Sequence, residues 1–273
     1  MSMLICPVCL LPLAAEEKRF VCEKGHSFDR AAAGYVNLFL NQGSSAKRHG
    51  DDKAMIRART AFLSTGAYAP LSDKLVAASL PLLEEGSLFA DAGCGEGHYT
   101  ALLADALAKE GKNARLVGVD LSKEAVSAAA KRKKEITFAV ASVFHLPFAA
   151  ESVRLLWNIF APLAEEEYLR VLEKGGYLLR VFPLAEHLMG LKAAVYEKTY
   201  ENAPKEPACE GMRLLWREEL RFDLSLKKSE EIMALFSMTP YYYKTSAADQ
   251  EKLARLTSLT TPVAFGIELY QKD

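Results

Sequence analysis

The 273-residue sequence lacks several features that would assign it to particular classes of protein. No apolar stretch approaches the roughly 18 residues that a membrane-spanning helix needs, so we expect no transmembrane segment. The first residues turn polar too soon for a signal peptide, which favours a cytoplasmic protein. The five cysteines are an odd number and do not suggest a disulfide scaffold. A formal net charge of −1 provides no overall positive field for nucleic acid, and we find no internal repeat.

Apolar residues, in contrast, make up 50% of the chain, which is enough for the core of one large domain or of one domain with a small module. In the most informative stretch, an apolar run at 88–90 ends in Asp91 and is followed by a helical pattern from Tyr99. Between them lie three glycines: Gly93, Gly95 and Gly97. Glycine permits positive φ and lets a ligand lie against bare backbone. The stretch predicts a strand, a tight turn and a helix whose first N–H groups are open to a ligand.

The spacing of these glycines distinguishes two kinds of cofactor site. A dinucleotide fingerprint has glycines at relative positions one, three and six, but position six counted from Gly93 is His98. Asp-x-Gly-x-Gly-x-Gly resembles instead motif I of the class I S-adenosylmethionine methyltransferases. Their cofactor carries a sulfonium and an ammonium, for which a carboxylate such as Asp91 is a suitable partner. A glycine turn in an unrelated α/β enzyme is the alternative.

A second apolar run, 116–119, ends in Asp120, 23 residues after Gly97. The end of the second parallel strand is where an acid usually binds ribose hydroxyls, about 20 residues beyond the glycine loop. Asp120 is therefore predicted to bind the ribose of the cofactor. The alternative is an N-cap for the following helix, a position that Ser122 also suits.

Four residues near the amino terminus have the spacing of a zinc site: Cys6, Cys9, Cys22 and His26. Zinc takes four such ligands in a tetrahedron, and a module of this size is too small to fold on apolar burial alone. A redox Cys-x-x-Cys motif would leave the second pair unused, and four unrelated buried residues are the remaining alternative. Because protein ligands fill all four positions, we expect a closed, structural site in a zinc-ribbon-like hairpin.

The pattern of this module is similar to that of a known family. Cys-Pro-x-Cys from Cys6, Cys-x-x-x-His-x-Phe-Asp ending at Asp29, and Gly-Tyr-Val-Asn-Leu at 34–38 resemble the bacterial 23S rRNA guanine-N1 methyltransferases. In that family a zinc module precedes a class I methyltransferase domain. The resemblance covers the chain to about residue 198 and then thins.

The resemblance implies further site residues. In the family, residues corresponding to Tyr68, Tyr99, Thr100 and His187 contact the cofactor. The segment 158–162 resembles the family's Ile-Tyr-Ala-Pro, with Phe160 in place of the tyrosine, and implies a target-base pocket formed by Asn158, Phe160 and Pro162. An aromatic ring there suits stacking on an extruded base. An ordinary place in the core is the alternative for Tyr68, Phe160 and His187. Because 158–162 contains no carboxylate, we assign no proton acceptor.

These observations predict an α/β chain: a Rossmann-like class I methyltransferase with a small amino-terminal zinc-ribbon-like module. We place the zinc-binding, RNA-recognising module at 1–40, a basic linker at 41–53 and the methyltransferase domain at 54–273. Residues 199–215 read as irregular, 222–226 as a strand, 229–236 as a helix and 260–270 as a final strand.

The expected function is methylation of N1 of a guanine in a 23S rRNA hairpin, with S-adenosylmethionine as cofactor and structural Zn²⁺. The expected partner is that hairpin, with no membrane and with a homodimer left open. Two alternatives remain: a small-molecule methyltransferase with a zinc appendage, and a non-catalytic zinc-ribbon RNA-binding adaptor. The intact set of Asp91, the three glycines and Asp120 argues against the adaptor.

Overall fold

The structure is a computed structural model that describes residues 3–40, 52–196, 199, 201–202 and 209–273. Most of the predicted linker lies outside these residues. Within the described part of the chain, no helix is long and apolar enough to cross a membrane.

A mixed sheet forms the centre of the molecule, with the strand order β10-β11-β9-β8-β5-β6-β7-β4. The strands span β4 (Val36–Asn37), β5 (Leu88–Ala92), β6 (Arg115–Asp120), β7 (Thr137–Val140), β8 (Val153–Ile159), β9 (Leu172–Pro183), β10 (Met212–Leu226) and β11 (Leu259–Lys272). The strands from β4 to β9 are mutually parallel, whereas β11 and β10 pair antiparallel. The chain passes from β5 to β6 and β7, then returns to β8 on the other side of β5. Such a reversal of strand order opens a crevice at the carboxyl ends of the strands.

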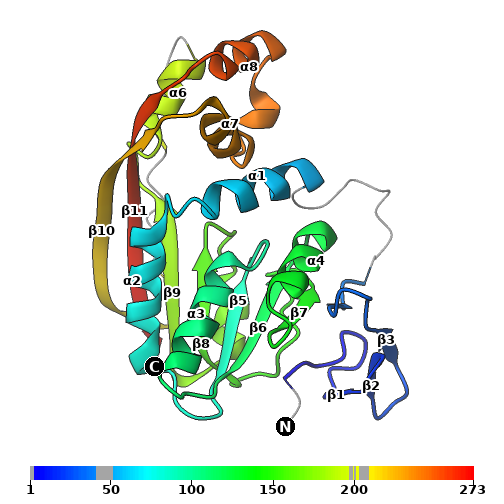
Figure 1. The fold of residues 1–273 in the computed structure, drawn as a ribbon. Helices are drawn as coiled ribbons and strands as arrows, with labels where there is room; N and C mark the ends of the chain where they lie inside the picture. The colour runs from blue at the N-terminus through cyan, green and yellow to red at the C-terminus, as the bar shows by residue number, and fades with distance from the viewer. Residues whose placement is uncertain (1–2, 41–51, 197–198, 200, 203–208) are drawn as a thin grey trace.

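Helices cover one face of the sheet and its carboxyl end (Figure 1). The helices span α1 (Lys53–Leu63), α2 (Ala69–Ser79), α3 (His98–Lys109), α4 (Lys123–Arg132), α5 (Glu165–Val171), α6 (Met189–Val195), α7 (Ser229–Ser237) and α8 (Ala247–Ala254), with 3₁₀ turns at Leu80–Leu82 and Tyr242–Lys244. Helix α1 lies across the carboxyl ends of the parallel strands and packs against α7. A hydrophobic core lies between the sheet and helices α2 and α3. In it the fully buried rings of Phe89 and Trp157 form a T-shaped contact, and Trp157 Nε1 donates to Ser79 Oγ at 2.9 Å.

The amino-terminal module covers part of the opposite face. Its small sheet consists of β1 (Leu13–Ala15), β2 (Arg19–Cys22) and β3 (Ser27–Asp29). The connection from β7 to β8, residues 141–152, contains no helix, although crossovers between parallel strands usually do. The amino-terminal module covers the sheet where such a helix would lie. Its Leu4 and Leu13 share a buried cluster with Leu146 and Phe148 of the connection.

Two contacts join the module to the catalytic sheet. The Ile5 N–H donates to the Pro147 carbonyl at 2.9 Å, and β4 extends the sheet by pairing with β7. The module is therefore continuous with the catalytic sheet at its edge. The predicted boundary at residue 40 stays a prediction.

The carboxyl third differs most from the sequence-based expectation. The predicted helix at 229–236 and the strand at 260–270 are present, but β10 begins at Met212, inside the stretch expected to be irregular, and α8 was not predicted. Strand β10 is an edge strand with exposed residues along much of its length. Its first half, 212–219, lacks the alternation of apolar and polar residues by which a half-buried strand is detected, whereas the second half alternates and contains the predicted strand at 222–226.

Arg180 and Glu268 form a buried ion pair across β9 and β11, at 3.2 Å between Nη1 and Oε2. We expect Glu268→Leu to lower the free energy of unfolding by about 3–5 kcal/mol, because it leaves a buried guanidinium without its partner. The double variant Arg180→Met/Glu268→Leu should recover most of that loss. Urea unfolding measures both, with the surface pair Lys252–Asp249 as the control, for which Asp249→Asn should cost far less stability than Glu268→Leu. Equal losses for the single and double variants would contradict the argument.

Candidate functional site

The loop after β5 has the backbone conformation that its glycines predict. Gly93, Gly95 and Gly97 all have positive φ, at 93°, 54° and 74°, and Gly97 is the N-cap of α3. Neighbouring atoms also exclude side chains: a Cβ on Gly93 would lie 2.5 Å from Ala161 Cβ, and one on Gly97 would lie 2.9 Å from Ala129 Cβ. The loop is thus a bare backbone cradle at the carboxyl end of β5, where parallel sheets of this topology bind ligands.

Asp91 lies under this loop and is almost fully buried. Thr100 Oγ1 donates to Asp91 Oδ2 at 2.5 Å, whereas Oδ1 has no hydrogen-bond partner in the protein. Burial raises the pKa of Asp91 to about 7; the Thr100 hydrogen bond opposes that shift and the charge of Asp120 adds to it. A buried acceptor without a partner is costly, so this oxygen suits a cationic ligand group such as an ammonium.

Asp120 lies at the end of β6, beside the glycine loop. Its Oδ2 accepts a hydrogen bond from the Gly95 N–H at 3.0 Å, and its Oδ1 accepts from the Ser122 N–H at 2.8 Å. Ser122 itself caps α4, because its hydroxyl accepts from the Ala125 N–H. The helix therefore has its own N-cap, and Asp120 is placed next to the cradle as the ribose interpretation requires.

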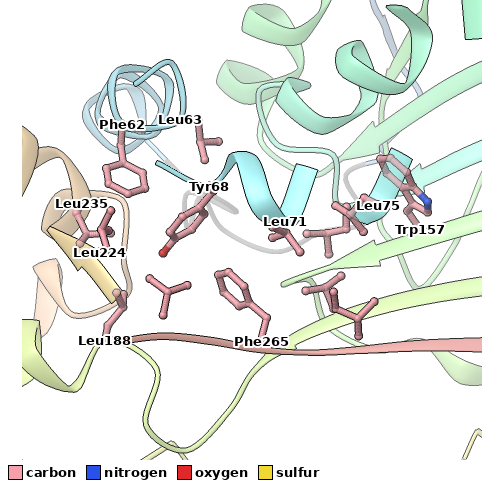
Figure 2. Packing of buried hydrophobic residues seen from close by; sticks show 14 of the residues in the cluster. Phe62, Leu63, Tyr68, Leu71, Leu75, Trp157, Leu188, Leu224, Leu235 and Phe265 are labelled. Carbon is pink, nitrogen blue, oxygen red and sulfur yellow. The ribbon is translucent and has the colours of Figure 1, made fainter. Parts of the chain in front are cut away.

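A group of aromatic rings meets on Phe265 of β11 (Figure 2 labels Phe62, Tyr68 and Phe265). The centroid of the Phe265 ring lies 5.2 Å from that of Tyr68, 5.1 Å from Phe160 and 4.7 Å from His187. Tyr68 is buried, its hydroxyl has no hydrogen-bond partner in the protein, and burial raises its pKa well above the ordinary value. Three residues predicted from distant parts of the sequence are thus brought together.

The tautomer of His187 follows from its contacts. Its Nδ1 accepts a hydrogen bond from the Ala264 N–H at 3.2 Å, which places the proton of the neutral ring on Nε2. Burial, with a smaller contribution from the Lys192 charge, lowers the pKa of His187 to about 3. His187 is therefore neutral at physiological pH and donates through Nε2.

The predicted base-pocket residues divide into two kinds. Asn158 is buried, and its Nδ2 donates to the Pro162 carbonyl at 3.0 Å and to Tyr168 Oη at 2.8 Å, so it shapes the 158–162 turn. Phe160 is 46% exposed and has a φ of 56°, an unusual conformation for a residue with a side chain. Backbone strain of this kind occurs most often at functional sites. Phe160 is the ring that the turn presents outward.

The amino-terminal cysteines and histidine form a compact cluster. One ligand atom from each of Cys6, Cys9, Cys22 and His26 lies within 4.8 Å of all the others. The Cys9 and Cys22 sulfurs are 3.6 Å apart, and His26 Nδ1 lies 3.6 Å and 3.3 Å from the sulfurs of Cys6 and Cys22. Tetrahedral zinc with its usual bond lengths has edges of about 3.6–3.8 Å. The cluster fits a zinc ion with the Nδ1 atom of the histidine as ligand.

The remaining predicted cofactor residues line the start of α3. Thr100 holds Asp91, as described, and Tyr99 packs its ring edge-on to His98, at 5.1 Å between centroids. Sequence reasoning missed two residues of this region. Phe265 comes from the carboxyl third, where no motif marks it, and no motif marks Arg59, whose Nη1 approaches Gly95.

Asp91 should make the stability of the cofactor-free protein depend on pH. Its pKa is about 7 when folded, above the ordinary value of 3.8, so between these pH values the folded state retains a proton that the unfolded state has lost. This contribution to stability falls as pH rises through that window, by up to about 4 kcal/mol. Urea unfolding at pH 5 and pH 8 should show Asp91→Asn gaining stability over the wild type with rising pH. Parallel pH profiles would contradict the burial argument.

Zinc should be bound by this cluster alone. We expect native mass spectrometry to find one zinc per wild-type chain and none for Cys22→Ser, with faster proteolysis within 3–40 because the module loses the ion that holds it together. Cys209→Ser is the matched control, since that buried cysteine lies outside the cluster and should leave the zinc in place. Zinc retained by Cys22→Ser would rule out the assignment.

Two family models match the sequence. The model described as "RlmA, N-terminal", a zinc ribbon, matches residues 4–47, and the model described as "Methyltransferase domain" matches residues 89–179. The first range contains the whole metal cluster, and the second begins in β5 and contains the glycine cradle. Together with the geometry, they identify zinc as the structural metal and S-adenosylmethionine as the cofactor.

Three relatives are similar over most of the chain. A 23S rRNA (guanine(748)-N1)-methyltransferase of Streptomyces fradiae is 36% identical over 193 residues, which cover 70% of this chain and 66% of the relative. A Micromonospora griseorubida protein, provisionally named a 23S rRNA (guanine-N1)-methyltransferase, is 32% identical over 94% of this chain and 92% of its own. A Bacillus subtilis protein with a similar provisional name is 34% identical over 74% of this chain and 73% of its own. The chain therefore belongs to the 23S rRNA (guanine-N1)-methyltransferase family.

Proposed function

We propose that this protein transfers a methyl group from S-adenosylmethionine to N1 of a guanine in a hairpin loop of 23S rRNA. The observation that carries the proposal is the pairing of a glycine cradle over a buried, partly unpaired carboxylate with an exposed aromatic ring on the neighbouring strand end. The relatives named above add the substrate class. A small-molecule methyltransferase would need neither an exposed stacking ring nor a zinc ribbon.

The cofactor would lie across the carboxyl ends of β5 and β6. Asp91 Oδ1 would bind its ammonium, the backbone of Gly93, Gly95 and Gly97 would lie under its methionine and ribose parts, and Asp120 would bind its ribose hydroxyls. Tyr68, Tyr99, Thr100 and His187 complete the proposed set. When bound, the cofactor supplies a methyl group that its sulfonium makes electrophilic.

The target guanine would stack on Phe160. One side of this ring packs against Phe265 and the residue is 46% exposed, while Asn158 and Tyr168 donate to the Pro162 carbonyl and hold the turn. Nucleobases in RNA are recognised in single-stranded loops, where they can be splayed out onto aromatic side chains. The pocket would thus accept a base from a hairpin loop and exclude one held in a helix.

Catalysis would rest mainly on alignment. Holding the guanine N1 in line with the transferred methyl group is a proximity effect that can contribute about 7–11 kcal/mol at best. The N1 proton must also leave. His187 does not accept it at Nδ1, which the Ala264 N–H occupies, and Nε2 carries a proton of its own. The residues of the 158–162 turn offer backbone carbonyls and an amide, so the proton would pass to solvent.

The amino-terminal module would contribute to RNA binding. Its zinc cluster fixes the turn at 6–10, on which Val8 and Leu10 are exposed at 53% and 70%. Contact with rRNA would place the protein in rRNA processing and in the cytoplasm. Cations on α1, such as Lys53 and Arg57, lie on the side of the molecule that would face the RNA backbone.

The decisive experiment incubates the zinc-loaded protein with methyl-labelled cofactor and 23S rRNA hairpins. Nuclease digestion and mass spectrometry should identify 1-methylguanosine, and a hairpin with adenine in place of the target guanine should take up no label. Label found only in small metabolites, or on another atom of the base, would reject the proposed function.

Phe160 provides the mutational test. We expect Phe160→Ala to lower kcat/KM for the hairpin by roughly 5- to 150-fold, which corresponds to about 1–3 kcal/mol for one stacked base. Phe160→Tyr keeps the ring and should retain most activity. The affinity for S-adenosylhomocysteine should change little in either variant. An alanine variant as active as the tyrosine variant would show that the ring does not hold the base.

A further inference from the structure

Arg59 occupies an unusual position on α1. The buried side chains of this helix are Met55, Ile56, Phe62 and Leu63. Residue 59 lies three or four positions from each of them, so it falls in the middle of the apolar stripe. Arg57, two positions away, is exposed. An arginine in the buried stripe points its charge into the molecule, toward the elements that α1 covers.

The element that Arg59 meets is the glycine loop. Its Nη1 lies 3.3 Å from the point where a Cβ on Gly95 would be, so the guanidinium approaches the bare backbone of the cradle. Its charge also acts on Glu96, inside this loop, and on Tyr99, just after it. Burial raises the pKa of Glu96 and of Tyr99, and the Arg59 charge opposes the shift in each case.

The acid inside the loop already has another cation. Glu96 is buried and forms an ion pair with Arg132 of α4, whose Nε also donates to the Glu96 carbonyl at 3.2 Å. Arg132 therefore holds Glu96, while Arg59 reaches the same loop at Gly95. A guanidinium in this position can donate to an anionic group of a ligand that lies on the cradle.

The cofactor brings such an anion. The methionine end of S-adenosylmethionine is a zwitterion, and a site that binds it must pair both an ammonium and a carboxylate. Asp91 Oδ1 is a buried, unpaired acceptor that suits the ammonium, but it would repel the carboxylate. A guanidinium matches a carboxylate with two parallel hydrogen bonds. Arg59 is held at the loop by a helix that crosses the carboxyl ends of the strands.

We propose that Arg59 binds the carboxylate of the methionine moiety of S-adenosylmethionine, and so gives the site its selectivity for an intact amino-acid end. Asp91, at the end of β5, and Arg59, at Gly95, then bind the two opposite charges of the amino-acid end. The proposal concerns the cofactor alone and does not depend on which substrate is methylated.

Decarboxylated S-adenosylmethionine is the matched probe, because it lacks the carboxylate and keeps the sulfonium and the ammonium. The test measures the dissociation constants of both compounds by calorimetry on the full-length, zinc-loaded protein. In the wild type, we expect the intact cofactor to bind more tightly. In Arg59→Gln this preference should shrink by roughly 10- to 150-fold, the range for a hydrogen bond between charged groups. Arg59→Lys should retain part of the preference.

Arg57→Gln is the matched control, since it removes the same charge from an exposed position of the same helix and should leave the preference unchanged. The ratio of two dissociation constants measured on one variant does not depend on how much of the sample is folded, and thermal unfolding reports any loss of structure separately.

Three outcomes would overturn the proposal. Equal weakening of both compounds in Arg59→Gln would mean that the arginine only holds α1 in place. An unchanged preference with weaker binding of the hairpin would mean that it contacts RNA phosphate. An equal loss of preference in Arg57→Gln would mean that the effect is one of general charge. None of these outcomes bears on whether guanine N1 is the methylated atom.

Discussion

The site depends on one unfavourable arrangement: a carboxylate buried at the end of a parallel strand with an oxygen that no protein group satisfies. Asp91 can be held there because Thr100 binds one oxygen and because the loop that follows exposes bare backbone at Gly93, Gly95 and Gly97. The same burial that raises its pKa makes the site favourable for a ligand that brings its own positive charge. The cofactor-free protein is thus less stable than it would be with a neutral residue at position 91, and binding of a cationic ligand offsets the difference.

The zinc module belongs to the fold of the catalytic domain as well as to its surface. It covers the face that a crossover helix between β7 and β8 would otherwise protect, and its last strand becomes the edge of the catalytic sheet. A module of this size could not bury that surface without an internal constraint, and the zinc cluster supplies one. Zinc therefore stabilises the β4 edge of the sheet, two strands away from β6 and the proposed cofactor site.

The sequence allows accurate prediction where local rules determine the structure. The glycines with positive φ, the metal-ligand spacing and the acids at the ends of β5 and β6 each follow from a short pattern, and the structure brings them together as expected. Prediction fails where a residue acquires its role from distant parts of the chain. Phe265 looks like any buried strand residue. Arg59 belongs to no motif, although its place between Ile56 and Phe62 in an apolar stripe is a detectable signal.

Phe265 also explains why the carboxyl third is needed at all. The parallel strands and their glycine loop form the proposed cofactor cradle, but they do not by themselves position Tyr68 and His187. Strand β11 places one ring, Phe265, against Tyr68, His187 and Phe160 together. Tyr68 and His187 belong to the proposed cofactor side, and Phe160 to the proposed base side. A single antiparallel strand thus fixes the distance between the two halves of the site, and this distance determines whether a methyl group and a base nitrogen can meet in line.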